Sequence, residues 1–326
     1  MEPYRESVMK ILMIAENDPA GTAIAFTRAV NRLTPHSCRL VTTQTRYNHA
    51  WEKDLHIPDL GPEGLLELEE LLKGSDVFHF HMVIDENYRL GPFLPKDYLA
   101  GKTVVHHHHG HPDFRAHPEK YQEKYRKLCR DKLLVSTPDL LRKLPEASWQ
   151  PNLVPIDDPL YRPNGDTGNG KVRLSHSPTR KDLKNTDDLL HVCSRMGDLA
   201  RDGRLELDVI DNEPHTECLR RKRESHVVFD HMQGYYGVSS LEGLSQGKPT
   251  IAGLDDWNQQ QIRNFFQCEE LPWIVARSRD ELEGSIRSLV ADPEARARAG
   301  ENSRRFMEET WNESNVVNHL IQVYEQ

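Results

Sequence analysis

The stretch FDHMQGYYGVSSLEGLSQGKP, residues 229–249, decides how the chain is expected to fold. The apolar run before it ends at Asp230 or His231 and predicts a buried strand, and the glycines that follow mark a loop. A helix is expected to begin near Val238 and to end at Gly247, a residue type that caps helices. The next strand starts at Pro249. Strand, glycine-rich loop, helix and strand in this order predict one unit of a parallel sheet.

The same alternation extends outward through the second half of the chain. The expected strands are residues 171–177, 205–211, 226–231, 249–254 and 273–276. The expected helices are residues 186–200, 214–224, 239–247 and 256–266.

The first half repeats the pattern. Its expected strands are residues 8–16, 38–44, 75–83, 102–110 and 132–138, and its expected helices are 22–33, 62–74 and 117–130. The segment 151–170, rich in Pro, Gly, Asn and Asp, is the best candidate for a linker. Two doubly wound α/β halves joined there would bind ligands at the carboxyl ends of their strands, in a cleft between them. The tail, 296–326, is expected to form one or two amphipathic helices.

Composition limits the class of protein. The 326 residues carry a formal net charge of −9, and no stretch approaches the ~20 apolar residues of a membrane span. The first residues lack the features of a secretory signal, and five cysteines are scattered without a C-x-x-C pair, so a reducing cytoplasm is expected. Net acidity argues against nucleic acid as a partner. Peripheral contact with a membrane through a local basic patch stays open.

Two segments of the first half could carry chemistry. Gly21-Thr22 joins the first strand to a helix, where backbone N–H groups can approach an anion or a sugar hydroxyl; the alternative is an ordinary turn. Residues 106–109 are four successive histidines, and six of the 17 histidines fall between 106 and 117. On a strand, His107 and His109 share one face. A histidine pair near a substrate is favoured over a metal, because no carboxylate or cysteine stands at a recognised ligand spacing.

Two segments of the second half suit a nucleotide diphosphate. Arg180 and Lys184 follow a strand, and two cations there would neutralise a diphosphate as a bond to it breaks; a solvated basic turn is the alternative. In the decisive stretch, the N–H groups of Val238 and Ser239 begin a helix and would point at a ligand. Glu242, one turn later, could accept hydrogen bonds from two ribose hydroxyls, although a glutamate in a helix is most often solvated.

Together these segments resemble the retaining glycosyltransferases of GT-B fold, the glycogen-synthase-like and sucrose-synthase-like group. Residues 236–249 match that group's motif from the aromatic-Gly pair through a glutamate to Gly-Lys-Pro. His109-Gly110 with Asp113 and Arg115 resembles its "His-Gly-x-Asp-x-Arg" form. The resemblance implies two Rossmann-like domains facing a central cleft: residues 1–160 on the acceptor side, residues 161–305 on the donor side, and a C-terminal helix, 306–326, packing back toward the first domain.

The resemblance also implies a function: transfer of a sugar from a nucleotide-diphosphate sugar to a glycan, a lipid-linked or a small-molecule acceptor, with retention. No metal and no cofactor are expected, because basic side chains take the place of a cation. The catalytic candidates are His109, Arg180 and Lys184. The donor would bind to Arg180, Lys184, Gly237, Val238, Ser239 and Glu242. The acceptor side would comprise Gly21, Thr22 and Asp113.

One departure from the group is Gly234, which stands where the family has its first glutamate; Asp230, His231 or Gln233 would have to supply that contact. Gly234 makes one alternative plausible, a catalytically silent nucleotide-sugar-binding protein. A nucleotide-sugar epimerase of the same fold and a metal-dependent hydrolase built on the histidines also stay open.

Overall fold

A computed structural model describes residues 8–45, 52–165 and 170–326. It divides into two compact units: unit 1 is Met1–Asn152 with Ser314–Gln326, and unit 2 is Leu153–Glu313. Residues 1–7 of the expected first domain and 166–169 of the expected linker lie outside the described residues.

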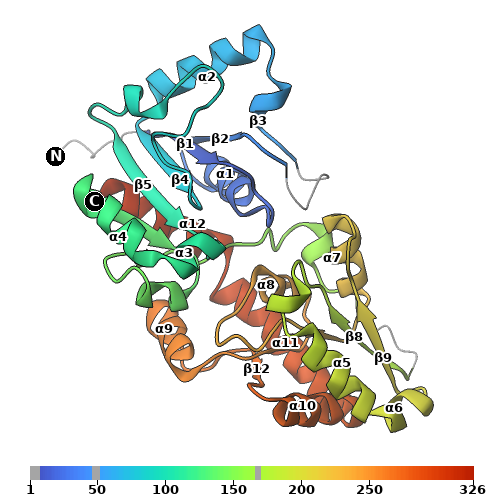
Figure 1. The fold of residues 1–326 in the computed structure, drawn as a ribbon. Coiled ribbons are helices and arrows are strands. Elements are labelled where there is room, and N and C mark those ends of the chain that lie inside the picture. Colours follow the sequence, from blue (N-terminus) through green and yellow to red (C-terminus); the bar gives the residue numbers. More distant parts are fainter. Residues whose placement is uncertain (1–7, 46–51, 166–169) are drawn as a thin grey trace, which may run out of the picture. The chain divides into compact units, whose positions relative to one another are not determined.

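Unit 1 contains a parallel sheet in the order β3-β2-β1-β4-β5-β6-β7 (Figure 1). Its strands are β1 (Lys10–Ala15), β2 (Ser37–Thr42), β3 (Leu55–His56), β4 (Val77–His81), β5 (Thr103–His108), β6 (Lys132–Val135) and β7 (Ser148–Trp149). Its helices are α1 (Thr22–Leu33), α2 (Pro62–Gly74), α3 (Pro112–Ala116), α4 (Pro118–Lys127) and α12 (Glu313–Glu325), with short 3₁₀ turns η1 (Ile57–Asp59), η2 (Pro95–Tyr98) and η3 (Pro138–Arg142).

Unit 2 contains a second parallel sheet, in the order β12-β11-β10-β8-β9. Its strands are β8 (Val172–His176), β9 (Leu205–Val209), β10 (Val227–Phe229), β11 (Thr250–Ala252) and β12 (Ile274–Val275). Its helices are α5 (Thr186–Arg195), α6 (Gly197–Arg201), α7 (His215–Arg223), α8 (Val238–Ser245), α9 (Asp256–Phe266), α10 (Arg279–Ala291) and α11 (Pro293–Glu309), with turns η4 (Pro159–Tyr161) and η5 (Lys181–Leu183).

Each sheet packs against helices of its own unit through a separate apolar core. In unit 1, side chains of β1, β2 and β4 pack against α2 through Leu68 and Leu72, which are completely buried. In unit 2, strands β8, β10 and β11 pack against α5 and α10. Central strands such as β4 and β10 are buried on both faces because helices cover both sides of each parallel sheet. The prediction of two doubly wound α/β halves is therefore confirmed.

Strand order fixes where each unit can bind a ligand. The chain reverses its direction of winding between β1 and β4 in unit 1 and between β8 and β10 in unit 2. At such a switch point the two loops that follow the strands diverge and leave a crevice at the carboxyl ends of the strands. The residues after β8 and β10 are therefore the first place to look for a ligand site in unit 2.

The secondary structure departs from the sequence prediction in a few places. The expected helix 186–200 is split into α5 and α6 at Met196, and α10 was not anticipated. Strands β3 and β7 have only two residues each, too few to produce a periodic signal. The prediction of one or two helices in the tail is confirmed by α11 and α12.

The ends of the units also differ from the expected limits at 160 and 306. Residues 153–161 cluster with unit 2, where the Arg304 guanidinium donates hydrogen bonds to the carbonyls of Ile156 and Tyr161. The last residues of the chain cluster with unit 1. There the Tyr324 hydroxyl contacts His79 Nδ1 at 2.6 Å, and Lys132 donates to the carbonyl of Val323.

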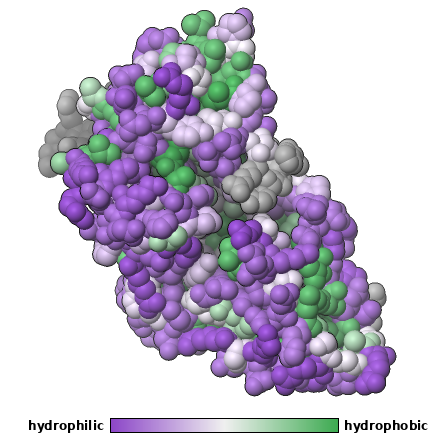
Figure 2. Space-filling view, in the orientation of Figure 1, coloured by the Kyte–Doolittle hydropathy of each residue, from purple (hydrophilic) through white to green (hydrophobic). Residues whose placement is uncertain are grey.

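The visible surface is largely hydrophilic. Figure 2 shows polar side chains over α4, for example, in agreement with its sequence PEKYQEKYRK. Among the described residues, no helix is long and apolar enough to cross a membrane.

Candidate functional site

The candidate site of unit 2 is built at the switch point between β8 and β10. The loop after β8 runs through η5 to Lys184 and Asn185, and the loop after β10 runs from Asp230 to Gly237. Helix α8 begins directly after Gly237, so its first N–H groups, which have no acceptor within the helix, lie at the same edge of the sheet. The structure thus gives the decisive stretch the strand, loop and helix that the sequence predicted.

Asp230 joins the two loops. Its Oδ2 accepts hydrogen bonds from the Gly237 backbone N–H at 2.5 Å and from the Ser240 hydroxyl at 2.8 Å. Its Oδ1 lies 3.4 Å from Lys184 Nζ. Gly237 permits this close approach, because a Cβ there would lie 2.9 Å from the Lys184 ammonium. Lys184 is therefore held against the start of α8, as a cation at a helix N-terminus.

Asp230 is an anion in this structure. Burial alone would raise its pKa, but His231 and Lys184, together with the hydrogen bonds from Gly237 and Ser240, hold that pKa well below its ordinary value. The Asp230 carboxylate accepts a hydrogen bond from the Gly237 N–H at the N-terminus of α8, where the helix dipole favours an anion. The N–H groups of Val238 and Ser239 are the ones left to face a ligand.

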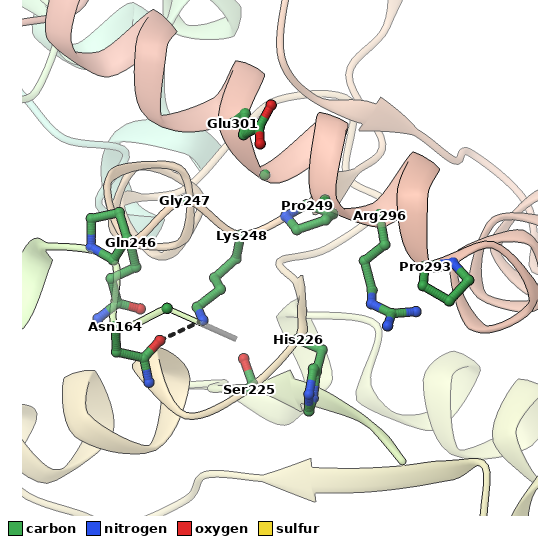
Figure 3. Close-up of a pocket in the computed structure, with 14 residues that line it drawn as sticks. Asn164, Ser225, His226, Gln246, Gly247, Lys248, Pro249, Pro293, Arg296 and Glu301 are labelled. Atoms are coloured by element: carbon green, nitrogen blue, oxygen red, sulfur yellow. Dashed lines mark hydrogen bonds between the residues drawn. The ribbon is translucent and has the colours of Figure 1, made fainter. Parts of the chain in front are cut away.

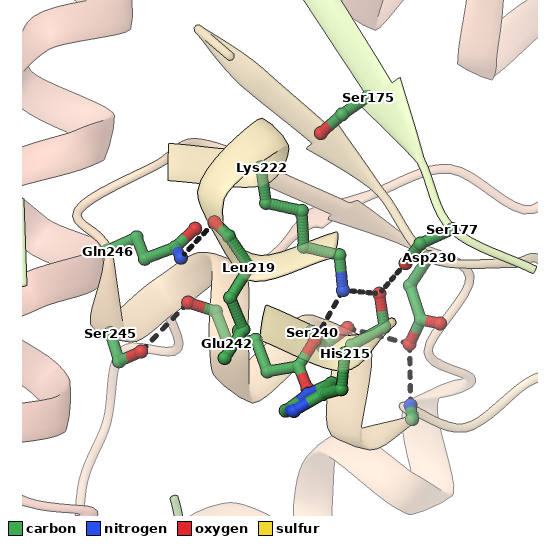
Figure 4. A network of polar contacts seen from close by, with 12 residues as sticks. Ser175, Ser177, His215, Leu219, Lys222, Asp230, Ser240, Glu242, Ser245 and Gln246 are labelled. Carbon is green, nitrogen blue, oxygen red and sulfur yellow. Dashed lines mark hydrogen bonds and ion pairs between the residues drawn. The ribbon is translucent and has the colours of Figure 1, made fainter. Parts of the chain in front are cut away.

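Glu242 lies in a buried ion pair within the polar network drawn in Figure 4. Lys222 of α7 donates from Nζ to Oε2 of the glutamate, and His215 Nε2, also on α7, lies 2.7 Å from Oε1. Burial would raise the pKa of Glu242, but the charges of Lys222 and His215 and their hydrogen bonds lower it to about 2. Each carboxylate oxygen has two lone pairs, so each retains capacity for one more hydrogen bond.

Ser239 connects this ion pair to the start of α8. Lys222 Nζ donates to the Ser239 hydroxyl at 2.8 Å, and that hydroxyl lies 3.2 Å from the hydroxyl of Ser177, just after β8. Sequence reasoning did not single out Lys222 or His215. Their signal is weak, because α7 has a run of four basic residues, of which only Lys222 is buried.

Arg180 is placed differently from Lys184. Its guanidinium pairs with both carboxylate oxygens of Asp182 on the η5 turn, at 3.0 and 2.5 Å, and both side chains are about half exposed. The carboxylate of Asp182 offsets part of the positive charge that Arg180 would bring to a diphosphate. The role expected for it from the sequence stays a prediction.

Gly234 stands where the family has its first glutamate, and its backbone conformation is one that a glutamate would rarely adopt. Its φ is 90°, which L-residues rarely adopt, and its carbonyl accepts a hydrogen bond from the Asp255 N–H. A glutamate at position 234 would therefore have a strained backbone. The substitution Gly234→Glu would not simply restore the contact that the family's first glutamate makes.

We expect Gly234→Ala to lower the free energy of unfolding by about 1–2 kcal/mol, the cost of forcing an L-residue into positive φ. A Cβ meets only Asp255 there, at 3.6 Å, so backbone strain rather than a clash sets the effect. Urea unfolding measures it. Gly197→Ala is the control, because Gly197 begins α6 without positive φ and with open space around a Cβ. Equal effects in both variants would contradict the backbone argument.

In unit 1, an aspartate of the loop after β1 caps the helix that follows the loop. Gly21 has a φ of 64°, and the Asp18 carboxylate accepts hydrogen bonds from the N–H groups of Ala23 and Ile24. This carboxylate satisfies the start of α1. Gly21 and Thr22 lie at that loop as predicted from the sequence, and Thr22 is buried. Their proposed contact with an acceptor stays a prediction.

The polar side chains of the segment after β5 also pair with other residues of unit 1. Asp113 accepts hydrogen bonds from Lys120 and from the Tyr121 hydroxyl, and Arg115 pairs with Asp139 at 2.6 Å. His109 Nε2 lies 2.9 Å from His81 Nδ1. Burial lowers the pKa of His109 to about 4, so its imidazole is neutral at pH 7.

His109 belongs to a cluster of rings that the sequence analysis did not assemble. His79 and His81 of β4 lie beside His107 and His109, with the rings of His79 and His81 stacked at 4.3 Å and those of His107 and His109 4.1 Å apart. The sequence HFH in β4 was the signal that could have revealed it, because His79 and His81 are two residues apart and so share one face of a strand, as His107 and His109 do.

A separate cavity of about 370 Å³ opens at the other end of the unit 2 strands (Figure 3). Ser225 and His226, which precede β10, and Pro249, which precedes β11, line it. Lys248 points into it and donates to Asn164 Oδ1 at 3.1 Å. Because these residues lie at the amino ends of the strands, the cavity is apart from the candidate site.

No protein-family model and no curated protein sequence matches the chain. Solved structures do. HepE from Anabaena, solved with UDP-glucose, is similar with a TM-score of 0.65 and 10% identity, over 97% of this chain and 99% of that chain. A glycosyltransferase from Rickettsia africae has a TM-score of 0.61 and 12% identity, over 98% of both chains.

TarM from S. aureus, solved with UDP, fondaparinux and alpha-GlcNAc-glycerol, has a TM-score of 0.56 and 15% identity, over 80% of this chain. The chain spans only 58% of that chain. These likenesses, with the two parallel sheets, show that the chain has the GT-B fold of glycosyltransferases.

Proposed function

We propose that the protein is a glycosyltransferase that takes a sugar from a nucleotide-diphosphate sugar, with UDP as the nucleotide. The observation that carries the proposal is the meeting of Lys184 with the N-terminus of α8 at the switch point of unit 2. A cation beside the first N–H groups of a helix suits a diphosphate, and Lys184 with the N–H groups of Val238 and Ser239 would bind it here.

The neighbours in structure support the choice of donor. HepE was solved with UDP-glucose and TarM with UDP, so a GT-B fold similar to this one holds such ligands in both proteins. Glycan and glycerol compounds in the TarM crystal support a hydroxyl-bearing acceptor.

In the proposed reaction, the bond between the anomeric carbon and the diphosphate breaks through an oxocarbenium-like state. Negative charge grows on the leaving diphosphate, and the Lys184 ammonium and the N–H groups of Val238 and Ser239 stabilise it. Glu242, held as a carboxylate by Lys222 and His215, would accept hydrogen bonds from the ribose hydroxyls. Retention of the anomeric configuration is proposed from the family resemblance, and NMR of the product's anomeric proton tests it.

Turnover of a panel of nucleotide sugars tests the proposal as a whole. We expect release of UDP from at least one UDP-sugar in the presence of a sugar acceptor. Gly234 favours one other function, a nucleotide-sugar-binding protein without activity, because no carboxylate stands at that position. Such a protein would raise its melting temperature with a nucleotide sugar and release no UDP.

We further expect that EDTA added at the start of the assay leaves turnover unchanged, and that Mg²⁺ or Mn²⁺ does not increase it. Lys184 and the start of α8 supply the positive charge that a divalent cation supplies in other sugar transferases. Initial rates with and without chelator measure this. Loss of turnover that Mn²⁺ restores would show that the leaving diphosphate needs a metal.

A further inference from the structure

Three buried histidines of unit 1 gather on one face of the sheet. His81 and His107 are paired in register across β4 and β5, and His79 precedes His81 by two residues, so all three side chains point to the same side. One ring nitrogen from each lies within 4.8 Å of those of the others. Three histidines that leave a fourth position open are a known ligand set for zinc.

Two ring nitrogens in this group have no hydrogen-bond partner among the residues that the structure describes: Nε2 of His81 and Nε2 of His107. Their other nitrogens are used, since His81 Nδ1 contacts His109 at 2.9 Å and His107 Nδ1 contacts His79 at 3.2 Å. Buried polar atoms in native proteins are rarely left unpaired, and bonds to a metal ion would satisfy these two.

A further contact resembles the surroundings of a metal site. His79 Nδ1 lies 2.6 Å from the hydroxyl of Tyr324, on α12. A hydrogen bond to the second ring nitrogen fixes the orientation of a ligating imidazole. His79 is therefore held in place from α12. Its Nε2, which contacts His107 Nδ1 at 3.2 Å, would exchange that contact for the bond to the metal ion.

We propose that His79, His81 and His107 bind one divalent transition-metal ion of the zinc type. Imidazole ligands without carboxylates favour zinc, copper or nickel over magnesium or calcium. The residues of this site belong to unit 1, and none of them is part of the donor site proposed in unit 2. The proposal replaces the expectation from the sequence that no metal binds, which was reached without His79 and His81.

The test uses the full chain without a purification tag, dialysed overnight against a chelator and then equilibrated with Zn²⁺. We expect one zinc ion per chain by elemental analysis, and a Zn²⁺-dependent rise in melting temperature. His81→Gln and His107→Gln should each weaken zinc binding by at least about a hundredfold. His108→Gln is the matched control, because His108 is equally buried on β5 but points to the opposite face.

Three results would overturn the proposal. The first is wild-type protein without stoichiometric zinc, and the second is unchanged affinity in the His81 and His107 variants. The third covers the case in which those variants do not fold: X-ray absorption at the zinc edge of the wild-type protein that counts fewer than three imidazole ligands. In each case the cluster is only a buried polar network.

Discussion

We expect Lys184→Ala to lower turnover about a hundredfold and to weaken binding of the nucleotide sugar much less. The ammonium lies 3.4 Å from Asp230 and against Gly237, at the start of α8. Charge on the diphosphate grows as the glycosidic bond breaks, so a cation here stabilises the transition state more than the bound donor. Removing one such contact typically costs about 3 kcal/mol of transition-state stabilisation.

Lys181→Ala is the matched control for this effect. Lys181 lies on the same loop, but it is half exposed and pairs with Asp211. The measurements are kcat and the donor dissociation constant, each determined separately in both variants and in wild type. If the Lys184 variant keeps turnover within threefold of wild type, Lys184 is not part of the site.

We expect Glu242→Ala to lower the free energy of unfolding by about 3–5 kcal/mol, because it leaves the ammonium of Lys222 buried without the glutamate. Glu217→Ala is the control on α7, where the glutamate pairs with Arg220 at the surface, and it should change stability by no more than about 0.5 kcal/mol. Chemical unfolding of both variants measures the difference. A Glu242 variant as stable as the control would contradict the buried pair.

The loss of unfolding free energy in Glu242→Ala also depends on pH. The folded-state pKa of Glu242 is about 2, below its ordinary value of 4.5, so the carboxylate stabilises the fold fully above pH 4.5 and loses this effect as pH falls toward 2. The difference in unfolding free energy between wild type and Glu242→Ala should therefore shrink below pH 4.5.

Binding is tested with the isosteric Glu242→Gln, which removes the charge and keeps the size. A carboxylate that accepts hydrogen bonds from ribose hydroxyls contributes to the affinity of the nucleotide itself. We expect the dissociation constant for bare UDP, measured by calorimetry, to rise by at least about tenfold. A folded variant that binds UDP like wild type would limit Glu242 to its structural pairing with Lys222.

Much of the fold could be predicted from the sequence because a buried parallel strand leaves a strong local pattern. The apolar run before Asp230, the glycine-rich loop and the helix from Val238 were all predicted from adjacent residues. The meeting of Lys184 with this loop was also predictable, since both follow strands of one sheet. The two-residue strands β3 and β7 were not, because so short a run has no period.

The partners of the site residues could not be predicted. Lys222 reads in the sequence as one of four successive basic residues of α7, and only packing buries it beside Glu242. The pairing of Arg180 with Asp182 depends on the tight turn of η5. His79 and His81 are far in sequence from His107, and only the register of β4 with β5 brings them together.

The assignment of Ser314–Gln326 to unit 1 has a consequence for the order in which the protein can fold during synthesis. A ribosome makes α12 only after it has made all of unit 2, whereas domains usually fold as they emerge. Until then the nascent unit 1 lacks Tyr324, the partner of His79, and the buried apolar side chains of Val316, Val317 and Leu320. The first unit to be translated is thus the last to be completed.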